Sequence, residues 1–399
     1  MFRTKKALVL FSIPLLFSTV KAFTLDETAL VILKGGADFQ GEVLSLEALA
    51  QNMKTDSNLP DPQLGGEYLV AAGDEPNRWG MDLTWNVEWP GVYNARGKEA
   101  EAKLEVRKQF ITVDRKNRLA DIKKLLLDYV LQEKTLQLID GLAKNAETMI
   151  EVAQTSVKSG EITRLELDKL GLEKALLNAS RVSLIDERSV TETQLAELFG
   201  ADCSPLLKQM ICEFPTVTLP TREEIECISA SSPEVLAAMA QTEAARRARK
   251  VASMEALPNL SVGYLHEFED GMHFNGASLG ISVPIFSSRN KQKAAKADIA
   301  EAVFKAESEQ AKATIQIEQY LKRISQLRSQ IAETAPFLEN EDHAALLQKA
   351  YENNLITMID YLTEINYFTK ARIELLALRH AESTAMAELE RYIATKSEY

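Results

Sequence analysis

An internal repeat most limits what this chain of 399 residues can fold into. Residues 89–93 resemble residues 283–287, and residues 160–166 resemble residues 354–360. In both pairs the spacing is the same, because Pro90 matches Pro284 and Thr163 matches Thr357, each 194 positions later. Self-similarity at a fixed spacing indicates a duplicated structural unit. We therefore expect one architecture built twice, with a first unit at 23–200, a linker at 201–233 and a second unit at 234–395.

Each unit begins with segments in which apolar and polar residues alternate, the pattern of a half-buried β-strand. In the first unit the strands are expected at about 64–74 and 79–89, and in the second at about 258–268 and 274–286. The sequence thus predicts two β-hairpins. In residues 79–89 the apolar face carries the three tryptophans of the chain, Trp79, Trp85 and Trp89. The polar face carries Asp82, Asn86 and Glu88.

A long helical stretch follows each hairpin. In both units apolar residues recur at the three- and four-residue spacings of coiled-coil seams. A helix of about 60 residues would be roughly 90 Å long, more than a compact domain needs, so these helices must pack on one another. We expect helices at about 94–156 and 163–199, and at about 288–354 and 357–393, with a kink or break at Pro336.

The turn between the two helices of each unit carries the same capping signal. A threonine precedes an acidic residue by three positions, so the hydroxyl can cap the helix while the carboxylate caps the threonine backbone. A glycine stops the preceding helix in the first unit, and an asparagine takes its place in the second. These turn residues are Gly160, Thr163 and Glu166, and Asn354, Thr357 and Asp360.

The first 22 residues have the pattern of a cleavable export signal. Three cations precede an apolar run at 7–17, and small residues stand at a cleavage site after Ala22. Removing the four cations of this leader lowers the formal net charge from −12 to −16. Such an acidic chain lacks the basic face that phosphate groups require, so nucleic acid is not an expected partner. Residues 396–399 form a short tail.

The apolar strand face has two readings. In a soluble protein it would be a core face. In an outer membrane it would face lipid, and about 10 residues suffice for a tilted membrane strand; the tryptophans would then lie toward lipid and the polar residues toward a lumen. Strand edges cannot stay unpaired in hydrocarbon, so several chains would have to close one barrel. Two chains would give 8 strands around a filled interior, whereas three would give 12 and can leave a pore.

The sequence offers no motif for catalysis or for a metal. Its four histidines lack zinc-type spacing, and no Walker A, dinucleotide-binding or nucleophile-elbow sequence occurs. We expect no catalytic residue, no cofactor, no metal site and no enzymatic activity. The three cysteines lie in the linker, where a Cys203–Cys212 disulfide and unpaired apolar side chains are equally compatible with the sequence.

In their order and duplication these features resemble the TolC family of outer-membrane efflux proteins. The resemblance is carried by the signal peptide, the strand entry at 257–260, the strand exit at 280–286 and the twofold helix turn, and it spans about 44–392. It implies a mainly α fold with a β part: a homotrimer with a 12-stranded outer-membrane β-barrel that continues into a 12-helix periplasmic α-barrel.

The resemblance also implies a function and partners. It implies a passive exit duct for heavy-metal or drug efflux, embedded in outer-membrane lipid and docked at its helix turns to a periplasmic adaptor and an inner-membrane pump. Asp360 matches the aspartate ring that narrows the periplasmic entrance in this family, and Glu166 is its repeat partner. Helix capping alone is the alternative for both acids. The rival functions are a periplasmic coiled-coil adaptor and a structural coiled-coil protein of the envelope.

Overall fold

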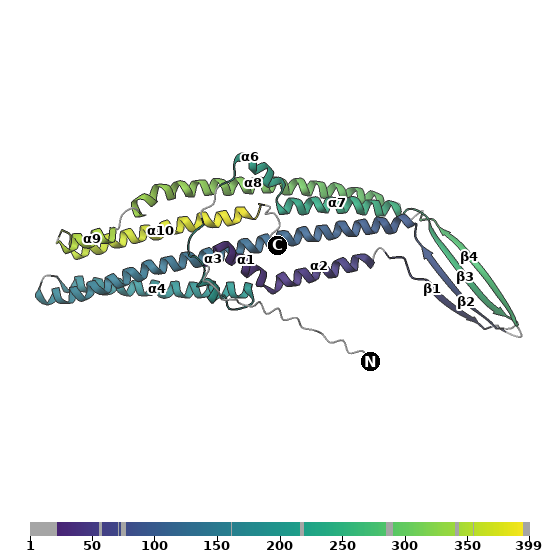
Figure 1. Ribbon diagram of the computed structural model, residues 1–399, viewed down its shortest axis with the longest axis horizontal. Helices are drawn as coiled ribbons and strands as arrows, with labels where there is room; N and C mark the ends of the chain where they lie inside the picture. Colours follow the sequence, from purple (N-terminus) through teal and green to yellow (C-terminus); the bar gives the residue numbers. More distant parts are fainter. Residues whose placement is uncertain are drawn as a thin grey trace.

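The protein is elongated, with its strands at one end and two helix turns at the other (Figure 1). The computed structural model describes residues 22–55, 58–70, 72, 77–160, 162–215, 219–284, 290–339, 343–353 and 355–393. Residues 1–21 of the expected signal peptide, Asn354 and the tail at 396–399 lie outside the described residues. In the described part, no helix is both long and apolar enough to cross a membrane.

The strands form one antiparallel sheet in the order β1-β2-β3-β4. Its members are β1 (Gln63–Leu69), β2 (Arg78–Val87), β3 (Asn259–Glu269) and β4 (Met272–Ser282). The central pairing, β2 with β3, joins the hairpin of the first unit to that of the second, and it places Trp79 opposite Phe268. The strands β1 and β4 are the edges of this sheet.

Several strand ends differ from the sequence prediction: β1 ends at Leu69 and β4 at Ser282, both earlier than expected. Two further differences have local reasons. The strand β2 ends at Val87 and not at residue 89, because Pro90 starts a helix and its fixed φ suits the first helical position. The strand β4 starts two residues earlier than expected. Asp270 and Gly271 both have positive φ values, 46° and 78°, so they form a two-residue hairpin turn that pairs Glu269 with Met272.

The first unit is organised around one very long helix. The helix α3 (Pro90–Ser159) has 70 residues and is about 105 Å long at 1.5 Å per residue. It ends at Gly160, whose φ of 78° lies in the left-handed region that favours glycine. The helix α4 (Arg164–Phe199) returns beside α3, and α7 (Pro233–Met254) also packs on α3. The four strands and α3 lie end to end in Figure 1.

The second unit has the same plan with one interruption. The single helix expected at 288–354 is instead two helices, α8 (Lys291–Glu339) and α9 (His343–Glu352). Pro336 lies in the last turn of α8, where its missing N–H removes a helical hydrogen bond, so a helix end shortly after it is physically reasonable. The helix α10 (Met358–Glu390) packs on both α8 and α3.

Four further helices belong to the first unit and to the linker. The sequence pattern did not predict α1 (Leu25–Gly35) and α2 (Ala37–Thr55), which lie along α3. Arg115 on α3 fixes α2: its Nε donates to the Glu42 carboxylate at 3.0 Å, and its guanidinium lies 4.2 Å from the Phe39 ring centroid. The linker forms α5 (Ser204–Leu207) and α6 (Arg222–Ala230), and α6 covers α8 near the middle of the molecule.

Among the described residues, three apolar clusters hold the helices together. The largest, where α1, α3 and α4 meet, has Leu126 and Val130 entirely buried. A second joins α8 and α10 through Ile317 and Ile324. The third lies next to the helix turns and is described below.

Two lysines, one of them buried, tie the end of α10 to the middle of α3. The Lys123 ammonium is largely buried and pairs with Asp26 at 2.6 Å and with Glu390. Burial alone would lower the pKa of Lys123, but the two carboxylates raise it above its usual value. Lys124 reaches Glu388 at 2.7 Å. This ionic band fixes the register of the two units at mid-length.

Candidate functional site

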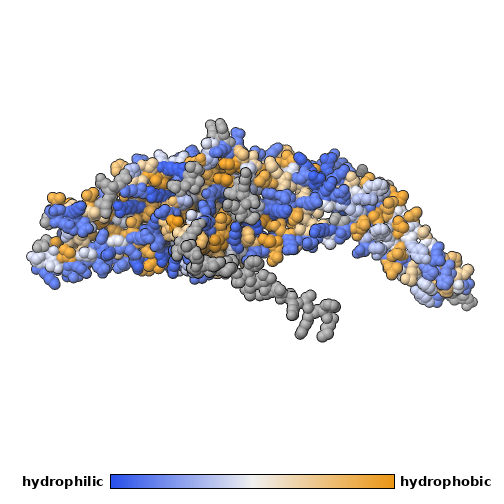
Figure 2. Space-filling model, in the orientation of Figure 1, coloured by the Kyte–Doolittle hydropathy of each residue, from blue (hydrophilic) through white to orange (hydrophobic). Residues whose placement is uncertain are grey.

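The sheet has one apolar face, and that face is exposed. Cross-strand pairing places Leu83 beside Tyr264, Trp85 beside Val262, and Leu260 beside Ile281 on the same side. Leu279 is 86% and Ile281 is 71% exposed in the single chain. Apolar residues are visible on the sheet next to the helices in Figure 2. An apolar surface of this kind needs lipid or another protein chain against it.

The opposite face is polar and lined by small residues. Here Gly65 pairs with Asp82, and Gly263 with Thr84 and Ser278. A Cβ atom on Gly65 would lie 2.3 Å from Asp82 Oδ1, and one on Gly263 would lie 2.5 Å from Ser278 Oγ. Small residues on one face let a sheet curve toward that face, as the inner wall of a barrel must. The polar face is therefore the concave side of any closed assembly.

The predicted strand residues divide between the strand and its exit. Trp79, Trp85 and Asp82 lie in β2 on the expected faces, as does the exposed Asn86. The Trp85 indole donates from Nε1 to the Pro60 carbonyl at 2.8 Å. The assignment of Glu88 and Trp89 to strand faces was wrong, because the strand ends at Val87. Trp89 is the residue that precedes α3, and Glu88 is held in an ion pair.

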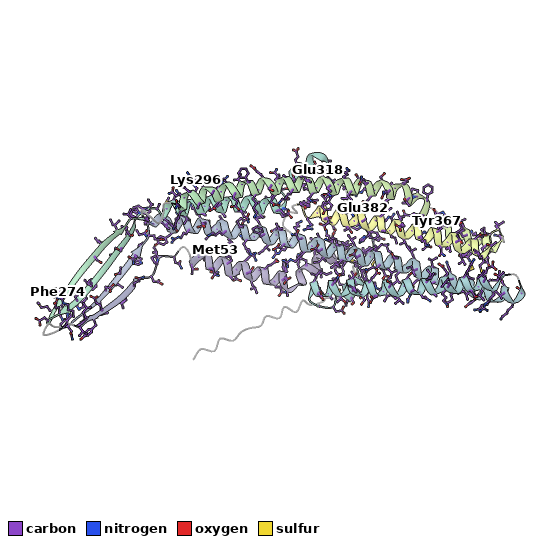
Figure 3. All side chains as sticks on the ribbon, turned by 180° about the vertical axis from the view of Figure 1, so that it is seen from behind. Met53, Phe274, Lys296, Glu318, Tyr367 and Glu382 are labelled. Atoms are coloured by element: carbon purple, nitrogen blue, oxygen red, sulfur yellow. The ribbon has the colours of Figure 1, made fainter. Side chains whose placement is uncertain are left out.

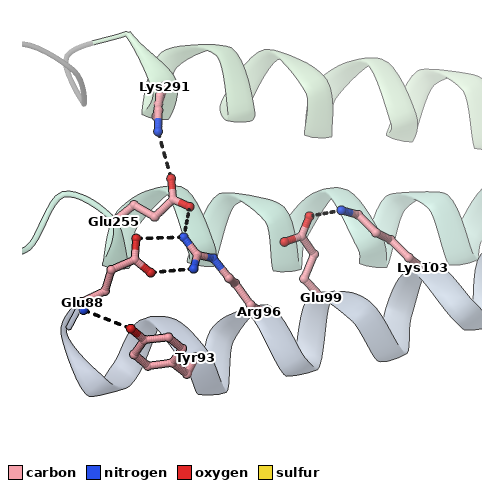
Figure 4. A network of polar contacts seen from close by, with 7 residues as sticks. All are labelled: Glu88, Tyr93, Arg96, Glu99, Lys103, Glu255 and Lys291. Carbon is pink, nitrogen blue, oxygen red and sulfur yellow. Dashed lines mark hydrogen bonds and ion pairs between the residues drawn. The ribbon is translucent and has the colours of Figure 1, made fainter. Parts of the chain in front are cut away.

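This ion pair belongs to a polar network at the junction of the sheet and the helices (Figure 4). Arg96 on α3 donates two hydrogen bonds to Glu88, at 2.5 and 3.0 Å, and one to Glu255 at the end of α7, at 2.9 Å. Lys291 at the start of α8 reaches the other oxygen of Glu255 at 2.9 Å. The Tyr93 hydroxyl accepts from the Glu88 backbone N–H at 3.0 Å. The network thus connects the strand exit to α3, α7 and α8, with Arg96 joining Glu88 to Glu255 and Lys291 joining Glu255 to α8.

The charges of this network stabilise one another. Burial of Glu255 would raise its pKa, but the hydrogen bonds from Arg96 and Lys291 outweigh it and lower the pKa below the usual value. The pKa of Arg96 is raised by its two carboxylate partners, which outweigh its burial. Sequence reasoning missed this network because its members are up to about 200 positions apart, from Glu88 to Lys291, and no local pattern connects them.

We expect Arg96→Met to destabilise the protein by about 1–3 kcal/mol, because it leaves Glu88 without its cation partner and Glu255 with Lys291 alone. The expected result is a lower thermal midpoint of the helical circular dichroism signal at neutral pH. Arg247→Met is the matched control. Arg247 has one exposed pair on its own helix, with Glu243 at 2.7 Å, and such a pair is worth less than about 0.5 kcal/mol.

The same variant has a pH signature. A carboxylate with a lowered pKa stabilises the fold above its unfolded pKa, and this stabilisation disappears as the pH falls through the folded value. The stability of the wild type should therefore fall below about pH 4.5 more steeply than that of Arg96→Met, in which the Glu255 pKa is less depressed. Equal midpoints of the two proteins at neutral pH would contradict a role for Arg96 in stability.

The two helix turns form the opposite end of the molecule, on the side of the labelled Tyr367 in Figure 3. At the α3–α4 turn, the Thr163 backbone N–H donates to Glu166 Oε2 at 2.6 Å, and the Glu166 N–H donates back to Thr163 Oγ1 at 3.3 Å. At the α9–α10 turn, Thr357 and Asp360 make the same reciprocal pair, at 3.2 Å each way. The capping boxes expected from the sequence are present in both units.

These hydrogen bonds also set the charge of the turns. The bonds from Thr163 lower the pKa of Glu166, and those from Thr357 lower the pKa of Asp360. Both acids are therefore ionised at neutral pH in the single chain.

The turns are held side by side by an apolar cluster. Met149 and Leu170 from the first unit contact Met358, Tyr361 and Ile365 from the second. Asn366 also donates from its amide to Glu173 at 2.9 Å, which links α10 to α4. Asp360 and Glu166 lie next to residues of this cluster in the chain, so the two hairpins present their acids at one end of the molecule.

The disulfide considered from the sequence is not formed. Cys203 is buried in the central apolar cluster, and its thiol donates to the Glu192 carbonyl at 3.5 Å. Cys212 packs against the same cluster, and Cys227 is exposed; all three are free thiols. Burial raises the pKa of the Cys203 and Cys212 thiols, as expected for apolar packing.

Solved structures with the same fold are outer-membrane channels. The CmeC outer membrane channel of Campylobacter jejuni is 14% identical, with a TM-score of 0.73, over 94% of this chain and 87% of that chain. The open state of the MtrE outer membrane channel of Neisseria gonorrhoeae is 15% identical, with a TM-score of 0.73, over 92% and 88%. The outer membrane protein VceC of Vibrio cholerae is 14% identical, with a TM-score of 0.69, over 92% and 95%.

No protein-family model matches the sequence, and no curated protein matches it. At identities of 14–15% the solved structures show the fold alone. The resemblance drawn from the sequence is confirmed at that level: the chain has the mainly helical fold with a small sheet that outer-membrane channels share over nearly their whole length.

Proposed function

We propose that this chain is one protomer of a passive outer-membrane exit duct. The observation that carries the proposal is the sheet, which has an exposed apolar face, a polar face of small residues and two open edges, and which leads directly into α3, a helix about 105 Å long. An enclosed polar channel that crosses a membrane and continues beyond it requires these features together.

The sheet edges define the assembly that the proposal needs. In hydrocarbon β1 and β4 must pair, and copies of the same chain are the simplest partners, β4 of one with β1 of the next. Three copies give a 12-stranded barrel with room for a lumen. The polar face then lines the lumen, the apolar face contacts lipid, and the helices enclose a periplasmic duct.

The duct has no energy source of its own in this proposal. An inner-membrane pump and a periplasmic adaptor deliver heavy-metal ions or drugs to the helix turns, and the duct conducts them outward. The mature chain, with a formal net charge of −16 without its leader, suits a conduit that favours cations.

Insertion into a planar bilayer tests this function. The purified protein is expected to give discrete conductance steps and to run as a trimer in detergent. A periplasmic adaptor or a structural coiled coil would give no conductance steps. Failure to insert into any lipid bilayer would exclude the duct.

Asp360 is proposed to form a ring of three carboxylates at the periplasmic entrance. Asp360→Asn removes the charge but keeps an oxygen that can accept from Thr357, so the cap is disturbed as little as possible. We expect a higher single-channel conductance and weaker block by multivalent cations, because a narrow acidic ring binds cations and slows their passage.

Glu166→Gln is the matched control, since it makes the same change in the other capping box. It is expected to leave conductance and cation block close to those of the wild type. Asp360→Asn channels that match the wild type in both measurements would leave Asp360 with the capping role alone.

A further inference from the structure

Two histidines meet at the end of the β3–β4 hairpin, on the apolar face of the sheet. His266 lies opposite Asn275, and His273 lies opposite Phe268, so the two histidines are diagonal neighbours on the same face. The sequence separates them by seven positions, and the tight Asp270–Gly271 turn brings them together. Their rings are stacked, with centroids 5.4 Å apart.

The contacts of His266 fix which nitrogen is free to bind a ligand. Its Nδ1 lies 2.8 Å from Asn275 Oδ1, an oxygen that cannot donate, so Nδ1 carries the hydrogen. The Tyr264 hydroxyl donates to the same oxygen at 2.6 Å and holds the amide in place. In the neutral ring the Nε2 atom of His266 therefore carries no hydrogen and has a lone pair. In the metal-free protein this nitrogen accepts a hydrogen bond from His273 Nδ1 at 3.4 Å, and a bound ion would take the place of that hydrogen, with His273 in its Nε2-protonated tautomer.

We propose that His266 and His273 bind a divalent transition-metal ion of the zinc type. Imidazole nitrogens bind zinc at about 2.0–2.1 Å, and two such nitrogens 3.4 Å apart subtend an angle of about 110° at the ion, close to tetrahedral. The hydrogen bond from His266 Nδ1 to Asn275 is the outer-shell contact that orients metal-binding histidines.

The protein supplies two ligands to this site. In the described part of the chain no group of three or more His, Cys, Asp or Glu side chains could hold a metal ion. The site lies beside the exposed Asp270–Gly271 turn, at the tip of the sheet, where water can reach the remaining coordination positions. The Trp79 ring lies 5.5 Å from the His266 ring and stacks on Phe268 at 5.9 Å, so aromatic side chains border the site on the strand side. A bound ion would link β3 to β4 beside their turn. This site rests on the strand geometry and not on the duct function.

Calorimetric titration with Zn²⁺ tests the site, using the untagged protein in detergent at about pH 7.5. The exposed Cys227 is replaced by serine in every sample, because a free thiolate also binds zinc. We expect one ion per chain, and at least about tenfold weaker binding for His266→Gln and for His273→Gln. Asn275→Ala should weaken binding by a smaller factor, since it removes only the contact that orients His266. His343→Gln, on α9, is the matched control and should bind as the wild type does.

Two further readouts make the outcome decisive. Protons compete with metal for imidazole, so Zn²⁺ affinity should fall from about pH 7.5 to about pH 5.5. Co²⁺, a spectroscopic substitute for zinc, should quench part of the tryptophan fluorescence in the wild type and a smaller part in Trp79→Phe, which keeps only the two tryptophans farther along the chain. Equal Zn²⁺ affinity of the wild type and both histidine variants would overturn the proposal. So would binding that is lost in the His343→Gln control. Conductance measured on the same samples reports separately on the duct.

Discussion

Gly263→Val is expected to prevent the sheet from assembling. Gly263 is buried on the polar face, where an added Cβ would lie 2.5 Å from Ser278 Oγ on one neighbouring strand and 3.4 Å from Thr84 Oγ1 on the other. The serine hydroxyl can rotate away from a single methyl group, but the two γ-carbons of valine would meet both strands at once. Overpacking of this kind costs about 1–3 kcal/mol per chain, and a closed assembly meets it in every copy.

Gly276→Val is the matched control for this prediction. Gly276 lies on the same face, opposite Leu265, and nothing lies within 4 Å of its added Cβ. We expect this variant to insert and assemble, with a conductance reduced by the extra side chain in the lumen. The measurement is the yield of heat-resistant oligomer in detergent. Normal assembly of Gly263→Val would show that the polar face is not tightly curved.

The helices and strands that depend on short-range sequence patterns could be predicted from the sequence. The helices α3, α4 and α10 follow from apolar spacing and from the capping residues at their ends, which act over three or four positions. The hairpins follow from alternation. The break after α8 was foreseen at Pro336, although the sequence pattern alone did not show that a separate helix, α9, begins at His343.

Contacts between distant segments could not be predicted in this way. The helices α1 and α2 have little pattern of their own, and α2 is held on α3 by Arg115, 73 positions from Glu42. The network around Arg96 joins residues from both units. The pair His266 and His273 has no metal-binding spacing in sequence, and only the positive-φ turn between them makes it a pair.

The candidate site at the helix turns was only partly open to prediction. The capping boxes at Thr163 and Thr357 follow from local chemistry, and the structure has both. Within one chain these bonds lower the pKa of Asp360, whereas two further copies of the same carboxylate would raise it. Whether Asp360 acts on ions depends on that second effect, which arises between chains and leaves no trace in a single sequence.

The outer surface of α4 carries apolar side chains, and replacing two of them with lysine should separate the protomers. At about 100° per residue, four exposed apolar side chains of α4 fall within about 40° of one another and point away from the core. They form the α4 stripe: Leu165, Leu172, Leu176 and Val190, between 52% and 66% exposed. The helix α4 already packs on α3 with another side. In the single chain the α4 stripe therefore has no protein surface against it. The proposed assembly covers it with a neighbouring protomer.

Replacing Leu172 and Leu176 together with lysine is therefore expected to abolish the oligomer. Burial of two leucines contributes about 3–6 kcal/mol to each interface, and the variant also places two ammonium groups where water is excluded. Size-exclusion chromatography with light scattering should find monomers with an unchanged helical circular dichroism spectrum. The control carries lysine at Asn178 and Ser189, exposed positions of the same helix about 120° from the stripe. A trimer that survives the leucine changes would mean that α4 faces solvent or an adaptor, and the chains would then have to associate through the sheet edges and another helix.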